Sequence, residues 1–255
     1  MRSGHDLPVH ALILAAAGAL AGLVGAAGGI TSLISYPALL AIGLPALSAN
    51  IANNVALVAL CPGSVLGSRI ELRGRSGWLR RWLPICAVGG AAGAVLLLST
   101  PSDVFADIVP FLVAGGSLTL LAQPYLTLWL SRHEGLSPDL ALGAGLLLMC
   151  IYSGYFGAGA GVMVLTLVMI VAEPHLPTAN ALKNALLGAT SVATALVLVA
   201  FTTVDWSSVI PLAVGVFAGS RLGPAVTRRV PPGLMRWLIA LVGLGLAIDL
   251  WVTRT

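Results

Sequence analysis

The sequence predicts an all-α polytopic membrane protein, and charge content, hydropathy and segment length are the observations that predict it. Charged residues make up 9% of the 255 residues, against about 25% in a typical soluble domain. Hydrophobic residues reach 58%, and the mean hydropathy is +1.00. A soluble fold of this size needs a charged surface, which 13 basic and 9 acidic side chains cannot supply. The composition therefore argues against a soluble enzyme, a disordered chain and a conventional nucleic-acid-binding protein.

About eight hydrophobic segments lie between polar gaps. A helix that crosses the hydrocarbon core of a membrane needs about 20 residues. The first and fifth segments are about 35 residues long, which is too long for one straight crossing. We therefore expect these two segments to break, to tilt heavily or to double back. The segments are 9–43, 49–68, 82–99, 104–130, 138–172, 179–201, 207–223 and 233–252.

Charged residues lie in the gaps and near the chain ends, with one exception. The loop 69–81 carries five arginines. Short cytoplasmic loops of membrane proteins are enriched in arginine and lysine, so we expect this loop on the cytoplasmic side of a plasma (cell inner) membrane. The net charge of +4 fits this rule better than a nucleic-acid partner. The exception is Lys183, the only lysine, which lies inside the sixth segment.

The two halves of the chain repeat a pattern in the same order. Each half has a glycine cluster, a Leu-Pro pair, two asparagines four residues apart and a pair of glycines. Shared order of this kind predicts a single transmembrane domain built from two four-segment repeats, 9–130 and 138–252. The paired features are Gly22–Gly29 with Gly154–Gly161, Leu44-Pro45 with Leu176-Pro177, Asn50 and Asn54 with Asn180 and Asn184, and Gly89 and Gly93 with Gly215 and Gly219.

The arginines also indicate how the repeats are oriented. With loop 69–81 in the cytoplasm, segments three and four return the chain to the cytoplasm at 131–137. A fifth segment that crossed once would place Arg228 and Arg229 outside, against the positive-inside rule. A fifth segment that enters and leaves on one side places both arginines inside. The arginines therefore favour inverted repeats, each with a broken or re-entrant first segment; whether segments one and five are re-entrant or kinked single crossings stays open at this stage.

Inverted repeats with interrupted segments indicate a transporter whose site lies near the membrane midplane. Where a helix breaks, its N-terminal N–H groups carry a partial positive charge that suits an anion. Small residues also let membrane helices pack closely, which is the structural alternative for a single cluster. Because the clusters are paired and lie in overlong segments, we take the glycines as candidate substrate-binding positions: Gly28, Gly29, Gly159 and Gly161, with Gly25 and Gly157 as secondary candidates.

Asparagines and the lone lysine are the other candidate substrate-binding residues. Asn50 and Asn54 share one helix face, and so do Asn180 and Asn184. Buried amides can donate to a polar substrate, although they also hydrogen-bond between helices for stability. Lys183 is a candidate because burying an ionisable group in a membrane is costly; its alternative role is to extend to the interface. We select Asn50, Asn54, Lys183 and Asn184, with Asn180 as a secondary candidate.

No constellation in the sequence indicates catalysis, a metal or a cofactor. The three cysteines and four histidines are scattered, without metal-ligand spacing. No nucleophile–base pair, phosphate-binding loop or pair of carboxylates appears, so we expect a protein that is not an enzyme.

Several of these stretches resemble the TauE/SafE family of membrane anion transporters, often called sulfite exporters. The resemblance extends from about residue 11 to 250, and its most specific part is the stretch 179–184, Ala-Asn-Ala-Leu-Lys-Asn. The first-half glycine run departs from the family by ending Ala-Ala-Gly-Gly. The resemblance implies export or passage of sulfite and organosulfonates such as sulfoacetate. The other matching stretches are Tyr36–Pro45, Ala49-Asn50, Val55–Leu57, Pro62–Ser64, Gly154–Gly161 and Val204–Trp206.

Together the residues and the resemblance predict a transporter that moves small sulfur-containing anions by alternating access at a midplane site. The expected partners are the anion and the lipid bilayer, with no nucleic acid and no cofactor. A passive anion channel and a non-transporting membrane scaffold are the alternatives. Proton coupling, a homodimer, the direction of transport and the identity of the anion stay open at this stage.

Overall fold

The computed structural model describes residues 6–130 and 137–227, and these ranges fold into helices without a strand. The predicted all-α class is therefore confirmed. The predicted eighth segment, 233–252, and Arg228 and Arg229 lie outside the described residues. The elements are α1 (Asp6–Gly28), α2 (Ser32–Ala41), α3 (Ala46–Ala56), the 3₁₀ turn η1 (Leu57–Ala59), α4 (Leu60–Gly67), α5 (Ser76–Leu98), α6 (Ser102–Leu130), α7 (Pro138–Tyr155), α8 (Ala160–Val171), α9 (Leu176–Phe201) and α10 (Trp206–Thr227).

The described helices have the length and surface of a polytopic membrane protein. Five stretches are long and apolar enough to cross a membrane: Pro8–Gly28, Ala46–Gly67, Ser76–Leu98, Leu176–Phe201 and Trp206–Ala225. Large apolar side chains such as Leu12, Leu148 and Leu196 are exposed on the outside of the bundle. In a bilayer these side chains face lipid, where their exposure carries no hydrophobic cost.

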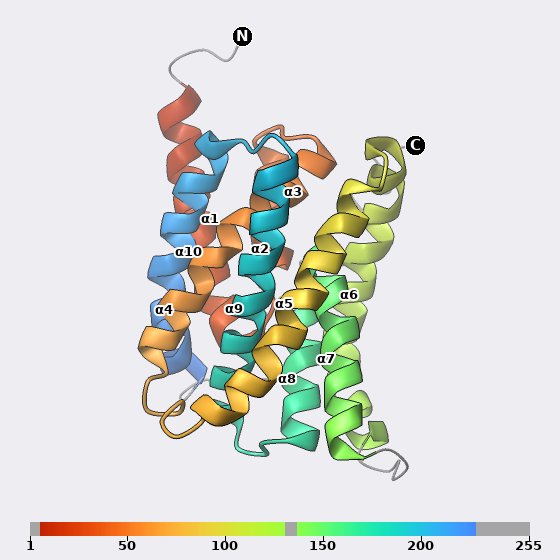
Figure 1. Cartoon of the computed structure of the whole chain (residues 1–255). Helices are drawn as coiled ribbons and strands as arrows, with labels where there is room; N and C mark the ends of the chain where they lie inside the picture. The colour runs from red at the N-terminus through yellow and green to blue at the C-terminus, as the bar shows by residue number, and fades with distance from the viewer. Residues whose placement is uncertain (1–5, 131–136, 228–255) are drawn as a thin grey trace.

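Both overlong segments are broken, as the sequence predicted. The chain turns between α1 and α2 at Gly29, where φ is +81°, and between α7 and α8 at Gly157 and Gly159, where φ is +78° and +76°. Glycine reaches these angles without strain. Figure 1 shows that α1 and α2 enter and leave at one end of the bundle, whereas α7 and α8 enter and leave at the other end. The two broken segments are therefore re-entrant from opposite ends.

The two breaks meet inside the bundle. Gly29 lies against Gly161 at the start of α8, with backbone directly on backbone. A Cβ atom built on Gly29 would lie 2.7 Å from the Gly161 Cα and 2.8 Å from the Val162 nitrogen. No side chain larger than hydrogen fits at this crossing without moving the backbone.

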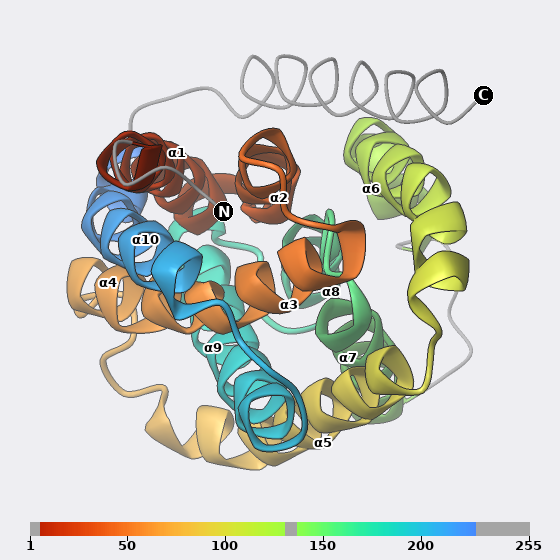
Figure 2. The ribbon, with the colours of Figure 1, turned by 90° about the horizontal axis from the view of Figure 1, so that it is seen from above.

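The later helices of each half of the chain pack against the broken segment of the other half. Helix α10 packs along α1 and α4, and α5 packs along α7 and α9 (Figure 2). Glycines make both approaches close, because a Cβ on Gly93 would overlap Ile151 on α7 and a Cβ on Gly219 would overlap Ala19 on α1. This close packing through small residues is typical of membrane helices.

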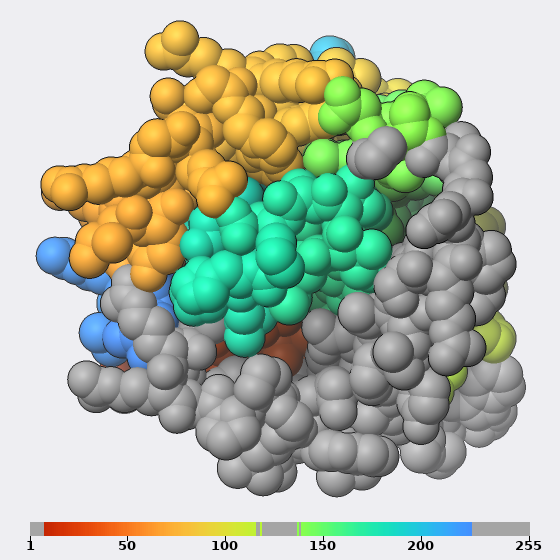
Figure 3. All heavy atoms as spheres, turned by 90° about the horizontal axis from the view of Figure 1, so that it is seen from below, coloured from red at the N-terminus to blue at the C-terminus, as the bar shows by residue number. Residues whose placement is uncertain are grey.

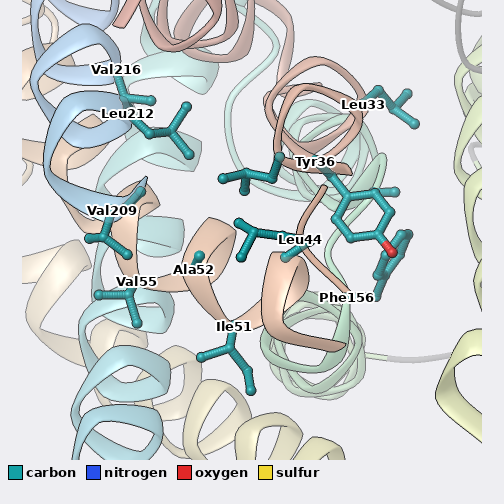
Figure 4. Packing of buried hydrophobic residues seen from close by; sticks show 14 of the residues in the cluster. Leu33, Tyr36, Leu44, Ile51, Ala52, Val55, Phe156, Val209, Leu212 and Val216 are labelled. Atoms are coloured by element: carbon teal, nitrogen blue, oxygen red, sulfur yellow. The ribbon is translucent and has the colours of Figure 1, made fainter. Parts of the chain in front are cut away.

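Apolar side chains from both breaks form the larger hydrophobic core. The Tyr36 ring on α2 meets the Phe156 ring beside α7 edge to face, with centroids 5.2 Å apart (Figure 4). The other labelled members of the cluster are Leu33 from α2, Leu44 before α3, Ile51, Ala52 and Val55 from α3, and Val209, Leu212 and Val216 from α10. The core fixes α2 against the end of α7, and so holds the two breaks next to each other.

Helix α5 begins at Ser76, whereas hydropathy predicted a segment from residue 82. Its first turns contain Trp78, Arg80 and Arg81, which hydropathy treats as loop. Backbone hydrogen bonding continues through these residues because tryptophan and arginine suit the interfacial region of a membrane. The Arg81 guanidinium lies 4.9 Å from the centroid of the Trp82 ring. Similarly, the segment predicted at 49–68 begins at Ala46 and contains the 3₁₀ turn η1.

At the end of the bundle that carries the arginine-rich loop, Arg75 forms an ion pair with Glu173, between α8 and α9. Figure 3 shows these two segments, orange and teal, side by side on this face. Glu173 also accepts a hydrogen bond from the His175 backbone nitrogen at 3.2 Å. The pair therefore joins the two halves of the chain at this face.

We expect Glu173→Gln to lower the free energy of unfolding by about 1–3 kcal/mol, because it removes the charge of a nearly buried carboxylate that accepts hydrogen bonds from Arg75 and from the His175 backbone. The Glu173 side chain is 11% exposed. Asp139→Asn is the matched control, since Asp139 pairs with Arg81 at 2.7 Å but is 61% exposed. Exposed pairs contribute about 0–1 kcal/mol. Thermal melts of both variants in the same detergent test whether Glu173→Gln loses more stability than Asp139→Asn. Equal losses of stability would contradict the prediction.

Candidate functional site

The two breaks place four helix ends inside the bundle. Helices α1 and α7 end there, and α2 and α8 begin there. The end of a helix leaves backbone C=O groups without helical partners, and the start leaves N–H groups without them. Because water is scarce at this depth, these groups need partners from the protein or from a ligand.

Three side chains of α9 bind the carbonyl end of α1. Asn180 Nδ2 and Asn184 Nδ2 donate to the Ala26 carbonyl at 2.8 and 3.0 Å. Lys183 Nζ donates to the Gly25 carbonyl at 3.2 Å, and the Gly29 nitrogen donates to the same carbonyl at 2.6 Å. Amine and amide N–H donors stabilise the partial negative charge at a helix C-terminus.

Helix α3 makes the comparable contact with α7. Asn50 Nδ2 donates to the Tyr155 carbonyl, the last of α7, at 2.8 Å. Asn54 Nδ2 lies 3.5 Å from Asn50 Oδ1. Each asparagine pair therefore contacts the broken helix of the other half of the chain.

Asn53, which precedes Asn54 on α3, holds the start of α2. Its Nδ2 donates to Ser32 Oγ at 3.1 Å, and Ser35 Oγ donates to Asn53 Oδ1 at 2.5 Å. These bonds fix the first turn of α2 beside the break.

A cavity of about 50 Å³ lies between the breaks and helices α3, α4 and α9. One water molecule needs roughly 10–15 Å³ measured in this way, so the cavity has room for a few waters or a compact ion. We name it the central cavity. Its lining is Gly25, Gly29, Thr31, Ser32, Asn54, Leu57, Leu60, Cys61, Ser153, Gly157, Ala160, Gly161, Lys183, Asn184, Leu187, Gly188, Thr190, Ser191 and Thr194.

Groups with positive partial charge line part of the central cavity. The first residues of α8, Ala160 and Gly161, and those before and at the start of α2, Thr31 and Ser32, line it. Helix N-termini carry about half a positive charge. Lys183 adds an amine, and no carboxylate is among the lining residues of the described chain. Hydroxyls and N–H groups facing a positive site can coordinate the oxygens of a small anion.

The structure brings together most of the predicted site residues. Asn54, Lys183, Asn184, Gly29 and Gly161 line the central cavity, as do the secondary candidates Gly25 and Gly157. The others are not lining residues: Asn50 and Asn180 bind helix-end carbonyls, Gly28 is the last residue of α1, and Gly159 precedes α8. Substrate binding by these residues stays a prediction.

Sequence reasoning did not select the hydroxyls that line the cavity, which are Thr31, Ser32, Ser153, Thr190, Ser191 and Thr194. Thr190 and Ser191 follow Lys183 and Asn184 by seven residues, and Thr194 continues the same face of α9. This helical spacing is the signal that could have found them. Thr194 donates to the Gly90 carbonyl at 3.0 Å, which ties the cavity wall to α5.

Two polar groups of α9 have incomplete hydrogen bonding within the described chain. The Lys183 side chain is 0% exposed and has one hydrogen-bond partner, the Gly25 carbonyl. Asn184 is 1% exposed, and its Oδ1 has no partner among the described residues. Buried groups in this state are costly unless a ligand or water completes them.

Comparison with known proteins agrees with this architecture. Residues 11–250 match the family model described as sulfite exporter TauE/SafE. The probable membrane transporter protein ORF9 of Sinorhizobium sp is 27% identical over 255 residues, covering 98% of this chain and 96% of that protein. The probable membrane transporter protein YfcA of Escherichia coli (strain K12) is 26% identical over 228 residues, covering 88% and 82%.

No solved structure matches this chain. The family match spans nearly the whole sequence and includes both breaks, both asparagine pairs and Lys183. The relatives carry the names of membrane transporters, and the described helices form a multi-pass membrane bundle. The chain is a membrane transporter protein that belongs to the TauE/SafE family.

Proposed function

We propose that this transporter moves small sulfur-containing anions, namely sulfite, sulfoacetate or related organosulfonates, across the plasma membrane. The observation that carries the proposal is the central cavity, where two helix N-termini and Lys183 converge without a lining carboxylate in the described chain. Such a site favours a negative charge and disfavours a cation. The family description, sulfite exporter TauE/SafE, narrows the anion to sulfur oxyanions.

The lining suits an anion with a compact oxygen-bearing head. Lys183 Nζ would pair with one oxygen, and the hydroxyls of Ser32, Ser153 and Ser191 would donate to the others. Leu57, Leu60 and Leu187 also line the cavity and would accept a short carbon chain. This combination of polar and apolar lining residues supports both sulfite and a small organosulfonate as substrates.

We further propose that the halves 9–130 and 138–252 are inverted repeats that rock against each other. Reciprocal contacts support this proposal: α1 packs on α10 as α7 packs on α5, and the glycine pairs Gly215/Gly219 and Gly89/Gly93 lie at the two contacts. Rigid-body rocking of such repeats around a fixed site opens the site to one face at a time.

Alternating access is favoured over a passive channel by the crossing of Gly29 and Gly161, where backbone contacts backbone beside the cavity. A channel needs a continuous path, whereas a transporter needs a closed contact that one motion can release. A scaffold without transport would leave a buried lysine and a polar cavity in the membrane without a use.

Purified protein in liposomes tests the proposal. We expect uptake of sulfite, sulfoacetate or a short alkanesulfonate that saturates with concentration, while ammonium-type cations do not enter. Liposomes without protein give the background. A flux that rises linearly without saturation would favour a channel, and the absence of flux for every sulfur oxyanion would overturn the proposed substrate class.

A further inference from the structure

The number of Lys183 N–H groups that lack an acceptor depends on the protonation state of the side chain. An ammonium group has three N–H donors and no acceptor. Among the described residues Nζ has one hydrogen-bond partner, the Gly25 carbonyl, and that carbonyl already accepts the Gly29 nitrogen. The neighbouring Ala26 carbonyl is taken by Asn180 and Asn184. A protonated Lys183 in the empty site would therefore keep two buried N–H groups without partners.

Within the part of the chain that the structure describes, the groups around Lys183 also leave an ammonium without a counter-ion. Among the lining residues contributed by α1 to α4, α7 and α8, the other titratable group is the thiol of Cys61. Cys86 on α5 and Cys150 on α7 lie near Thr190, further along α9. Helix α10 contributes no lining residue. Glu173, before α9, is paired with Arg75. Burying an unpaired charge is far more costly than burying a paired one.

We propose that each transported anion is carried together with one proton, and that Lys183 holds this proton. This inference rests on the proposed function and identifies the proton as the ion that is transported together with the anion. In the empty site Lys183 is the neutral amine. An arriving anion supplies the acceptors and the counter-charge that make the ammonium stable, so anion and proton bind together.

The proton balance of one cycle follows from this coupling. The Lys183 amine takes one proton from the aqueous phase to which the site is open, forming an ammonium–anion pair. The site then opens to the other face, the anion leaves, and the ammonium returns its proton to that phase. Lys183 ends as the amine, so one anion and one proton have moved in the same direction.

For a monoanion this cycle moves no net charge. A membrane potential acts on a single moving charge with about 2.3 kcal/mol per 100 mV. An uncoupled monoanion would therefore reach a concentration ratio of about 50-fold at 100 mV. A monoanion coupled to one proton would reach a concentration ratio near one at any membrane potential when the pH is equal on both sides. Each unit of pH difference across the membrane would change this concentration ratio tenfold.

The experiment uses full-length protein in liposomes that contain a pH-sensitive dye, with methanesulfonate as the probe because its single charge is fixed. We expect methanesulfonate entry to acidify the interior and to be insensitive to a potassium diffusion potential set with valinomycin. Uptake that follows the potential, without acidification, would overturn the coupling and leave the proposed function intact. No uptake of any sulfur oxyanion would instead count against the proposed function.

Lys183→Arg provides a variant with a charge that cannot be removed, because arginine does not deprotonate in proteins. We expect its remaining methanesulfonate flux to be free of proton movement and to respond to the potential. A variant that still acidifies the interior with each anion would contradict the role of Lys183. Because the wild-type measurement stands alone, the inference stays testable if the arginine variant does not fold.

Discussion

Replacing Gly161 with alanine should destabilise the protein by more than about 3 kcal/mol, because the new methyl group has no space. A Cβ atom at Gly161 would overlap the Gly29 backbone, and a Cβ at Gly29 would lie 2.8 Å from the Val162 nitrogen. Backbone cannot rotate away as a flexible side chain can. For a domain of this size the expected fall in Tm is about 6–12 °C, measured by thermal melting in detergent.

Gly77→Ala is the matched control for this prediction. Gly77 lies in the first turn of α5, and apart from its chain neighbours and the adjoining helix backbone no described atom is within 4 Å of the position that a Cβ would take there. Alanine at this position should leave Tm unchanged or raise it slightly, because alanine favours a helix over glycine by about 1 kcal/mol. Similar Tm values for the two variants would show that the two breaks do not depend on direct backbone contact.

Lys183→Met should remove most anion transport while the protein stays folded. Methionine fills similar space but removes the charge and its donors from the central cavity. Loss of a hydrogen bond to a charged partner costs about 1.5–3 kcal/mol, so we expect binding or flux to fall roughly 10- to 100-fold. Saturable sulfonate uptake into liposomes measures this loss.

Thr166→Val is the matched control for the lysine variant. Thr166 is a buried polar residue of α8, and its Oγ1 has no partner among the described residues, yet it does not line the cavity. Valine should keep wild-type flux and a similar Tm. Full transport by Lys183→Met, or an equal loss of transport in both variants, would contradict a substrate-binding role for Lys183.

The sequence predicted the broken segments because length and glycine clusters are local signals. A run of about 35 apolar residues cannot cross once, and the breaks fall within the glycine clusters, at Gly29 and at Gly157 and Gly159. The stretch containing Lys183 and Asn184 could also be predicted from the sequence, since a lysine inside an apolar segment is rare. Both lie at the central cavity.

Long-range partners could not be predicted in the same way. Asn50 bonds the Tyr155 carbonyl 105 positions away, and nothing in either local sequence indicates that contact. Thr31, Ser153 and Ser191 were not distinguished because serine and threonine commonly bond the backbone of their own helix. Only the packed arrangement shows which hydroxyls line a cavity.

The exchange of helix-end partners between halves has a consequence for biosynthesis. When the first half has entered the bilayer, the Gly25 and Ala26 carbonyls still lack Asn180, Lys183 and Asn184, which are translated more than 150 residues later. The Gly25 carbonyl accepts the Gly29 nitrogen within the first half, but the Ala26 carbonyl lacks its two asparagine donors until α9 is made, and an unpaired carbonyl is costly in lipid. The hydrogen bonding of the first half therefore stays incomplete during synthesis. The end of α1 gains its side-chain donors only when α9 is inserted.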